Sequence, residues 1–433
     1  MKLYLQLFLF FLTFSLFAQA KLERAEYFFS QGDYESTVRT ITGTRNLVKN
    51  NEQAALLLAV SYFQLNQLEQ SEELLKGLSV GKDVDYPSAW FYLGRLYHAQ
   101  HRFAEAGTNY KRYLRSLPKG AEERRLTINL IRMCDNGLRR SFSPDGMVVE
   151  NLGAQVNSSD DEFGPVPSPT GVARVYFSAV RPANPGLGNT TDRDQSDILL
   201  TELEATEWSI PRPLHTFLMS PQHELLLDIS KDGDELYYFR GETEVNGAYL
   251  IDTFQAGGNR EFTTLRLDVP ISPAMGDVTP FFYADNEIYF SSSRPGGYGG
   301  LDLYRLVKDN RGNWLPPQNL GADVNTAYDE TTPFLARDGQ TIYYSSNNPA
   351  FTVGGFDVLR SFYVPETDRF LRPENPGLPL NSAGNDTHFR LAPDTFTGFL
   401  SSDRKEGLGK RDIYIVYFIE PRTEMEAGRL DER

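Results

Sequence analysis

The stretch Asp277-Val-Thr-Pro-Phe-Phe-Tyr-Ala-Asp-Asn-Glu-Ile-Tyr-Phe-Ser-Ser-Ser-Arg-Pro-Gly-Gly-Tyr-Gly-Gly-Leu-Asp-Leu-Tyr304 decides the fold, because short strands and turns follow one another in it. Thr279 to Tyr283 is a short apolar run, and Glu287 to Ser291 alternates polar and apolar residues as a half-buried strand does. Asp285-Asn286, between them, is typical of a tight turn. The first half of the stretch therefore predicts two antiparallel strands joined by a hairpin.

The second half predicts two further strands. A glycine-rich loop, Arg294-Pro-Gly-Gly-Tyr-Gly-Gly300, leads into a third strand from Leu301 to Leu306. Lys308-Asp-Asn-Arg-Gly312 is a turn signal, and a fourth strand begins at Trp314. The loop is not a nucleotide cradle, because it lies between strands and lacks the helix N-terminus that holds phosphate in such motifs. The whole stretch predicts a four-stranded antiparallel unit.

The same unit recurs through the C-terminal two thirds of the chain. The aspartate that opens the third strand repeats every 55 residues, at Asp302, Asp357 and Asp412. Asp197 lies 105 residues before Asp302, which leaves room for one more copy, and in that copy Ala248 replaces the aspartate. Repetition at such a period is the signature of blades arranged around an axis. We predict a five-bladed β-propeller whose blades open near Asp161, Glu224, Asp277, Asp329 and Asp386.

The last repeat lacks a clear fourth strand. Residues 147–153, Met-Val-Val-Glu-Asn-Leu-Gly, resemble the end of a blade as it occurs at Gln318-Asn-Leu-Gly321. They precede the first blade, so pairing with the last blade would close the ring and leave no free sheet edge. We predict this closure, with the propeller spanning residues 141–420.

Residues 21–140 have the pattern of paired helices. Apolar residues recur at spacings of three and four along Asn51–Leu65 and Pro87–Gln100. Glu122 to Leu138 is amphipathic, and Asn136-Gly137 would make a good C-cap for it. We predict that this last helix caps the helical domain.

The helical region resembles the tetratricopeptide-repeat family. The large, small and helix-ending residues of that family stand at their expected spacing in Trp90-Phe-Tyr-Leu-Gly-Arg-Leu-Tyr97, Ala106, Tyr110 and Pro118. The small-then-aromatic pair of Gly94 and Tyr97 has earlier counterparts at Ala59 with Tyr62 and at Ala25 with Phe28. The resemblance implies an α-helical solenoid of three repeats.

In such solenoids the first helix of each repeat lines a concave groove. The family's groove positions give partner-binding candidates at Phe29, Leu56, Phe63, Phe91, Arg95 and His98. The alternative is that these side chains pack against neighbouring helices or against the propeller.

Strand alternation places the glycine-rich loops on the same side of the propeller as the loops before the first strands. This face therefore presents arginines beside carboxylates, and its candidate residues are Arg181, Asp277, Arg294, Asp329, Glu330, Asp386 and Arg404. They could form a binding ring, or a cation site at the central channel. Their recurrence in nearly every blade favours a structural role instead, in which each satisfies backbone groups or its counterpart on the next blade. The aspartates of the third strands are likewise expected to be structural.

Composition argues against several classes of function. The formal charge of -15 disfavours nucleic acid and anionic membrane surfaces as partners. The single cysteine, Cys134, cannot form an internal disulfide, and the five histidines belong to different elements, so no metal site or cofactor is predicted. No serine has the sequence context of a nucleophile elbow, and the carboxylates show no paired spacing beyond that of the repeat itself. We expect no enzyme.

The two ends of the chain predict its location. Met1-Lys2, the apolar run Leu3 to Phe17 and Ala18-Gln-Ala20 have the layout of a cleavable signal peptide over residues 1–20. The mature protein would then be periplasmic, without a membrane-spanning segment. Residues 421–433 form a charged tail.

The propeller units resemble the TolB-type, WD-like repeats of bacterial envelope proteins, through the Asp-Glu-x-x-Pro, Asp-Gly-x-x-Ile-Tyr and Gly-Gly-x-Asp patterns of these repeats. The order of signal peptide, tetratricopeptide domain and propeller resembles the PorE-like family of the type IX secretion machinery. Members of that family continue into a regulatory β-domain and a peptidoglycan-binding OmpA-like domain. This chain ends at Arg433, so attachment to peptidoglycan is not expected.

The resemblance implies a non-enzymatic periplasmic scaffold that binds protein partners of an envelope complex and reaches the outer membrane through them. One alternative is an envelope propeller that binds peptide or glycan ligands. A second alternative is a hydrolase with its active site in the channel, where the repeats could bring distant acids together.

Overall fold

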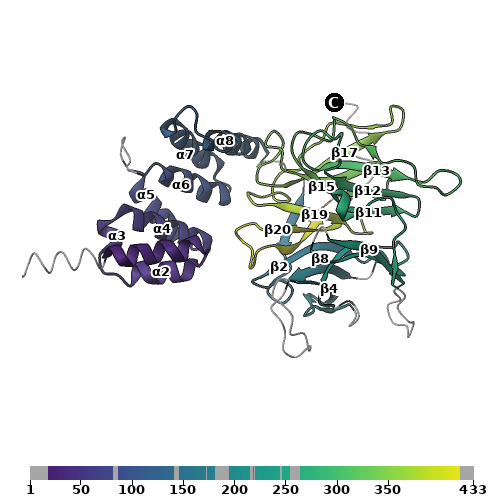
Figure 1. Ribbon diagram of the computed structural model, residues 1–433, viewed down its shortest axis with the longest axis horizontal. Helices are drawn as coiled ribbons and strands as arrows, with labels where there is room; N and C mark the ends of the chain where they lie inside the picture. The colour runs from purple at the N-terminus through teal and green to yellow at the C-terminus, as the bar shows by residue number, and fades with distance from the viewer. Residues whose placement is uncertain are drawn as a thin grey trace, which may run out of the picture. The chain divides into compact units, whose positions relative to one another are not determined.

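The computed structural model describes residues 18–80, 86–140, 146–171, 173–180, 195–214, 218, 220–243, 246–253 and 264–419. It divides into a helical unit, Met1–Leu138, and a β unit, Arg139–Arg433 (Figure 1). Most of the predicted signal peptide and all of the charged tail lie outside the described residues. None of the described helices is long and apolar enough to cross a membrane.

The helical unit consists of three helix pairs and a closing helix. Asp33 and Asn51 cap the N-termini of α2 and α4, where their side chains accept hydrogen bonds from the amides of Ser36 and Ala54 at 2.9 Å. The short helix α3 was not predicted. The helices are residues 18–30, α2 Tyr34–Thr42, α3 Leu47–Asn50, α4 Glu52–Gln64, α5 Leu68–Leu78, α6 Ser88–Ala99, α7 Phe103–Ser116 and α8 Glu123–Arg140.

Small residues let the helices approach closely. A Cβ atom at Gly94 would lie 2.6 Å from the Tyr110 ring, so no larger residue fits between α6 and α7. Gly137 has the same role on α8, where a Cβ would lie 2.6 Å from the Phe103 ring. The predicted C-cap at Asn136-Gly137 is wrong, because α8 continues to Arg140 and the glycine serves helix packing instead.

The β unit is a five-bladed propeller, as predicted, and each blade is an antiparallel sheet (Figure 1). Blade 1 contains β2 Asp161–Pro167, β3 Arg174–Val180, β4 Ser196–Glu204, β5 Glu207–Trp208 and β6 Arg212–Pro213; the last two both pair with β4. Blade 2 contains β7 His223–Ile229, β8 Glu235–Thr243, β9 Asn246–Thr253 and β10 Thr264–Arg266.

Blades 3 to 5 follow in chain order, with a short 3-10 helix, η3 Pro273–Met275, before blade 3. Blade 3 contains β11 Asp277–Ala284, β12 Glu287–Ser292, β13 Asp302–Val307 and β14 Gln318–Asn319. Blade 4 contains β15 Glu330–Leu335, β16 Thr341–Ser346, β17 Asp357–Val364 and β18 Arg369–Phe370. Blade 5 contains β19 Asp386–Leu391, β20 Thr397–Ser402, β21 Asp412–Phe418 and β1 Met147–Asn151.

The ring closes at β1, which is the outer strand of blade 5. Its Cα register with β21 runs antiparallel from Met147 opposite Phe418 to Asn151 opposite Tyr414. Asn151 Nδ2 also donates a hydrogen bond to Asp412 Oδ2 at 2.7 Å. The predicted closure is therefore confirmed, and it leaves β21 paired on both sides.

Asparagine side chains replace backbone pairing at the end of three blades. In blade 3 the fourth strand is only Gln318–Asn319, and Trp314, predicted to begin it, makes an isolated bridge with Lys308. Asn325 then hydrogen-bonds both backbone groups of Leu303, accepting from its amide at 2.7 Å and donating to its carbonyl at 3.0 Å. Asn381 and Asn157 repeat these contacts with Val358 and Ile413.

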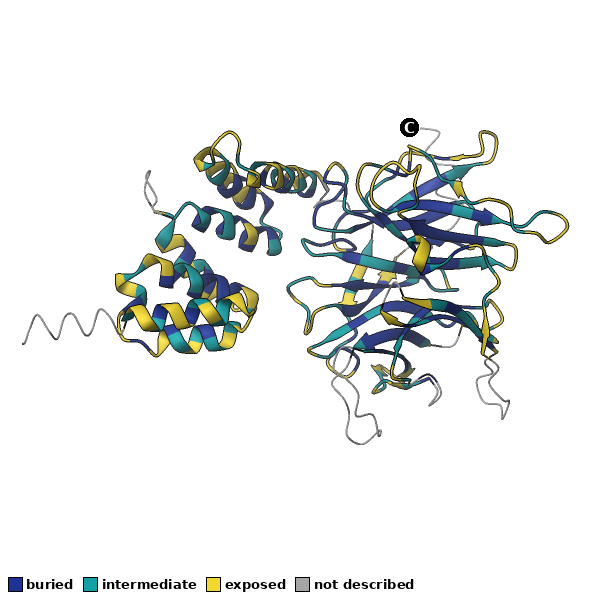
Figure 2. Ribbon diagram, viewed as in Figure 1, coloured by how far each residue is buried: buried dark blue, intermediate teal, exposed yellow. Residues whose placement is uncertain are grey.

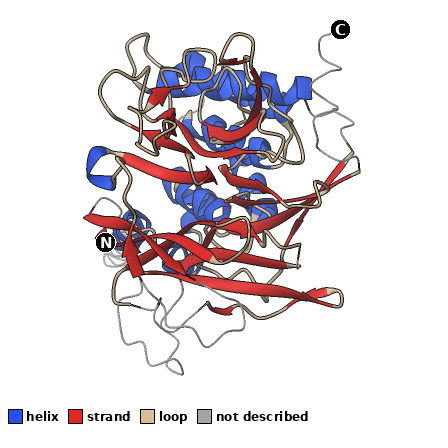
Figure 3. Ribbon diagram, turned by 90° about the vertical axis from the view of Figure 1, so that its right-hand side faces the viewer, coloured by secondary structure: helices blue, strands red, loops and turns tan. Residues whose placement is uncertain are grey.

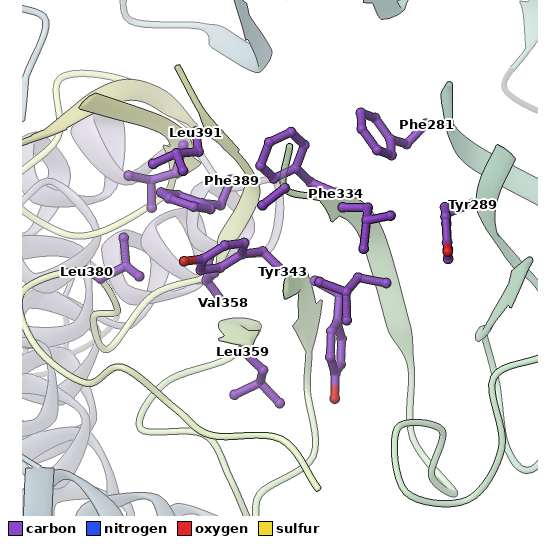
Figure 4. Packing of buried hydrophobic residues seen from close by; sticks show 14 of the residues in the cluster. Phe281, Tyr289, Phe334, Tyr343, Val358, Leu359, Leu380, Phe389 and Leu391 are labelled. Atoms are coloured by element: carbon purple, nitrogen blue, oxygen red, sulfur yellow. The ribbon is translucent and has the colours of Figure 1, made fainter. Parts of the chain in front are cut away.

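The core lies between neighbouring blades, where apolar residues from facing sheets interdigitate. Buried residues occupy the middle of the strands (Figure 2), and the strands of the β unit are joined by loops and turns (Figure 3). In the largest cluster Phe334, Tyr343 and Phe389 converge from blades 4 and 5 (Figure 4). The ring centroids of Tyr343 and Phe389 are 4.8 Å apart, and those of Phe281 and Phe334 are 5.2 Å apart.

Replacement of Asp302 tests the structural role of the third-strand aspartates. Asp302 Oδ2 is buried and accepts hydrogen bonds from the Tyr298 amide at 2.7 Å and from Asn319 Nδ2 at 2.8 Å. We expect Asp302→Ala to lower the free energy of unfolding by roughly 1–3 kcal/mol, because two partly buried donors lose a charged acceptor. Chemical denaturation would measure this loss. Asp302→Asn keeps an acceptor and should lose less; equal stability of wild type and Asp302→Ala would contradict the assignment.

Candidate functional site

Three of the carboxylates predicted on one propeller face, Asp277, Glu330 and Asp386, are buried and accept internal hydrogen bonds. Asp277 accepts hydrogen bonds from Ser292 Oγ at 2.6 Å and from Arg294 Nη2 at 2.7 Å. Asp386 and Arg404 form the same ion pair at 2.7 Å. Such charge-assisted bonds hold the glycine-rich loop against the start of the first strand. The arginines lie beside the carboxylates, and each of these two pairs lies within one blade. Of the two predicted kinds of partner, Arg404 has the backbone kind, since its Nη2 donates to the Leu380 carbonyl at 2.8 Å.

The other predicted residues of this face also have internal partners. Glu330, fully buried, accepts hydrogen bonds from the amide and hydroxyl of Thr326 at 2.8 and 2.7 Å. Asp329 Oδ1 accepts the amide of Leu301, in the preceding blade, at 3.0 Å. Arg181 lies outside the described residues. The described members of the predicted ring are engaged in holding blades and loops together.

The groove candidates of the helical unit differ in exposure. Phe63 and His98 are each 4% exposed, which agrees with the alternative that these side chains pack against neighbouring helices. His98 Nδ1 lies 3.4 Å from Tyr110 Oη and 3.8 Å from Cys134 Sγ, which makes it a core residue between α6, α7 and α8. Arg95 is exposed, as predicted. Phe29, Leu56 and Phe91 are partly exposed.

The innermost strands of the blades line a central channel, and each carries a β-bulge at the same level. The five strands are β2, β7, β11, β15 and β19, and each packs against the next around the ring. At four of the bulges one residue has a positive φ: Gly164 (65°), Thr279 (48°), Thr332 (52°) and His388 (55°). The bulges interrupt the ladder hydrogen bonds beside the channel.

Hydroxyl groups of neighbouring blades bond to most of the bulge amides. Ser401 Oγ of blade 5 accepts the Gly164 amide of blade 1 at 3.0 Å, and Ser178 Oγ of blade 1 accepts the Leu226 amide of blade 2 at 2.8 Å. Thr332 Oγ1 accepts the His388 amide at 3.3 Å. These bonds tie neighbouring blades together around the channel.

The series of hydroxyls is broken between blades 2 and 3. In four blades, a serine of the second strand lies opposite the first-strand residue that follows the opening carboxylate. In blade 2 this first-strand residue is Leu225, and Phe239 lies opposite it in place of the serine. No side-chain oxygen of the described residues accepts the Thr279 amide. One donor on the channel wall is therefore left without the hydroxyl that its counterparts have.

An ion pair divides the channel into two cavities. Arg390 of β19 reaches across to β7, where Nη1 lies 3.5 Å from Asp228 Oδ2 and Nη2 donates to the Leu227 carbonyl at 2.9 Å. Its guanidinium also lies 4.5 Å from the centroid of the Phe281 ring. The cavity toward the glycine-rich loops has a volume of about 230 Å³, and the one toward the tight turns about 80 Å³.

The larger cavity combines apolar walls with a few donors. Its polar side chains come from Tyr249, Thr279, Thr332, His388, Arg390 and Arg411. Burial, reinforced by the charges of Arg411 and Arg390, lowers the pKa of His388 to about 3, so its imidazole is neutral at pH 7. The apolar lining includes Phe163, Leu225, Leu227, Phe239, Val278 and Pro333.

Comparisons with known proteins identify similar structures at low identity. No protein-family profile and no curated protein matches the sequence. Residues covering 28% of this chain match 93% of the first tetratricopeptide-repeat domain of Spaghetti, at 24% identity and a TM-score of 0.25. TolB from Acinetobacter baumannii matches at 14% identity and a TM-score of 0.33, over 71% of this chain and 72% of TolB. An α-L-arabinofuranosidase from Lactobacillus brevis matches at 14% identity and a TM-score of 0.39, over 59% and 90%. These similarities assign no activity, and the architecture rests on the strand pairing itself.

Proposed function

We propose that this protein is a non-enzymatic scaffold of the bacterial periplasm that binds protein partners of an envelope complex. The proposal is carried by the carboxylates of the propeller face, which already form structural hydrogen bonds and ion pairs. Asp277 pairs with Arg294, and Glu330 accepts a hydrogen bond from Thr326. Residues held this way support loops and are not free to act as acid, base or nucleophile. The order of the modules in the sequence favours a secretion or surface-assembly complex of the type IX kind.

The helical unit offers a surface for such partners. Phe91, on α6, lies against Tyr92 and Tyr113, with ring centroids 5.5 and 5.2 Å apart, and all three rings are partly exposed. Arg95 is one turn further along the same helix and is exposed. Exposed aromatic rings beside an arginine are the composition enriched at binding hot spots. We take Phe91 and Arg95 as the centre of the partner-binding face.

Affinity purification from envelope fractions tests the proposal. We expect the full chain to recover a defined set of envelope proteins, and Phe91→Ala with Arg95→Ala to lose most of that recovery while keeping the wild-type melting temperature. Arg112→Ala, which removes an exposed arginine from α7, is the matched control and should recover the partners normally. A chain that purifies alone, or that hydrolyses a peptide or glycan, would contradict the scaffold role.

A further inference from the structure

We propose that the larger channel cavity binds the carboxylate at the C-terminal end of a peptide chain. The proposal rests on the scaffold function, because it makes the propeller a second site for protein partners. The cavity lining includes two arginines, a histidine and two threonines but no aspartate or glutamate. This is unusual within a chain of net charge -15, and it favours an anionic ligand over a cation.

Both arginines keep hydrogen-bond donors after their structural bonds are counted. Arg411 donates from Nε and Nη2 to Asp161, at 2.7 Å each, and lies 4.0 Å from the Phe163 ring centroid. A guanidinium has five N–H donors, and Nη1 of Arg411 and Nε of Arg390 have no partner among the described residues. Two arginines that are held in place and still have unpaired N–H groups are suited to bind a carboxylate. Binding then does not require the entropy loss of ordering their side chains.

Two further donors on the channel wall lack an acceptor among the described residues, the Thr279 amide and the imidazole of His388. Each of the equivalent amides, those of Gly164, Leu226, Thr332 and His388, donates to a hydroxyl group of the preceding blade. The Thr279 amide has no such hydroxyl. A ligand oxygen could take the place of this missing hydroxyl. His388 Nδ1 lies 3.0 Å from Thr387 Oγ1, while its Nε2 has no partner among the described residues. Donors from blades 3 and 5 thus line one cavity and lack acceptors among the described residues.

Size and closure select the end of a chain. A volume of about 230 Å³ is below the roughly 300–1,000 Å³ typical of pockets for drug-sized ligands, so only a terminal residue or two can enter. The Asp228–Arg390 pair closes the cavity on its inner side, which prevents a chain from threading through. The N-terminal end of a peptide would not be bound here, because its ammonium group would be repelled by the two arginines and the cavity lining has no carboxylate to pair with it. The apolar wall formed by Leu225, Phe239 and Val278 suits an apolar side chain on the last residue.

Calorimetric titration of the purified full chain with short peptides tests the proposal. The probe is the peptide N-acetyl-Ala-Ala-Leu with a free carboxylate, and its C-terminal amide is the comparison. We expect the amide to bind at least about 10-fold more weakly, since a charge-assisted pair is lost. Leu225→Glu places a carboxylate in the cavity and should abolish binding of the acid. Leu225→Gln has the same size without the charge and should keep most of it.

Other probes identify the source of the carboxylate. A peptide amide that ends in glutamate, a uronic-acid disaccharide and Ca²⁺ are titrated in parallel. Tighter binding of any of these three than of the free-carboxylate peptide would overturn the proposal, as would equal binding of acid and amide. The acid-against-amide comparison needs no variant, so it decides the matter even if Leu225→Glu fails to fold. If no peptide binds while envelope partners are still recovered through Phe91 and Arg95, this inference fails and the scaffold function stands.

Discussion

Replacing residues 147–153 by a glycine-serine segment of equal length is expected to destroy the folded propeller. The change keeps the tether but removes β1, so the β21 edge loses its five-residue partner strand and Asp412 loses Asn151. A sheet edge exposed in this way is a template for pairing with other chains. Since a domain is stabilised by only about 5–15 kcal/mol in total, the loss of its closing strand should remove most of that stability.

Size-exclusion chromatography and thermal melting measure this effect. We expect aggregation and the loss of the propeller's cooperative transition. A synthetic peptide of residues 146–153 should restore folding in part, because it supplies the missing strand together with Asn151. A monomeric variant that melts like the wild type would show that the pairing of β1 with β21 is not what holds the ring closed.

The blade architecture could be predicted from the sequence because it depends on local signals repeated at a fixed spacing. Asp302, Asp357 and Asp412 recur every 55 residues, and each occupies the first position of a third strand, β13, β17 and β21. Blade 2 could be placed even without its aspartate, and Ala248 does pair with Arg240 as Asp302 pairs with Ser292. Periodicity thus compensates for the weak signal of each short strand.

The exposure of the groove residues could not be predicted in the same way. Phe29 and Phe63 occupy corresponding positions in the repeat, yet Phe63 is buried and Phe29 is partly exposed. His98 carries no sequence signal that distinguishes a groove residue from a core residue, and its neighbour Cys134 comes from α8, 36 residues away. Burial of a side chain depends on such long-range packing, which repeat spacing does not encode.

A central channel was considered from the sequence, but the residues that line it were missed because they come from different blades. A signal was present: Gly164, Thr279 and Thr332 are small or β-branched residues, each followed by proline, at the same point of their repeats. Together they mark the bulge of the first strand. The repeat pattern does not show the consequence of having Phe239 in place of serine. That consequence falls on the neighbouring blade, where the Thr279 amide is left without a hydroxyl partner.

Acidification is expected to destabilise the propeller through His388. The folded-state pKa of this histidine is lowered to about 3, because burial and then the charges of Arg411 and Arg390 oppose its protonation. In the unfolded chain a histidine titrates near 6.5. The neutral form is therefore favoured by folding, and its contribution to stability is complete above pH 6.5 and declines as the pH falls from 6.5 toward 3.

At pH 4.5, two units below the unfolded pKa, the loss should be roughly 3 kcal/mol relative to pH 7.5. His388→Asn is the matched variant, because asparagine stays neutral and tolerates the positive φ of 55° at this position. Urea denaturation of both proteins at the two pH values measures the difference. The wild type should lose about 3 kcal/mol more than the variant on acidification. Equal losses would mean that His388 accepts a proton in the folded cavity, and the channel wall would then be better hydrated than its packing against Arg390 and Arg411 indicates.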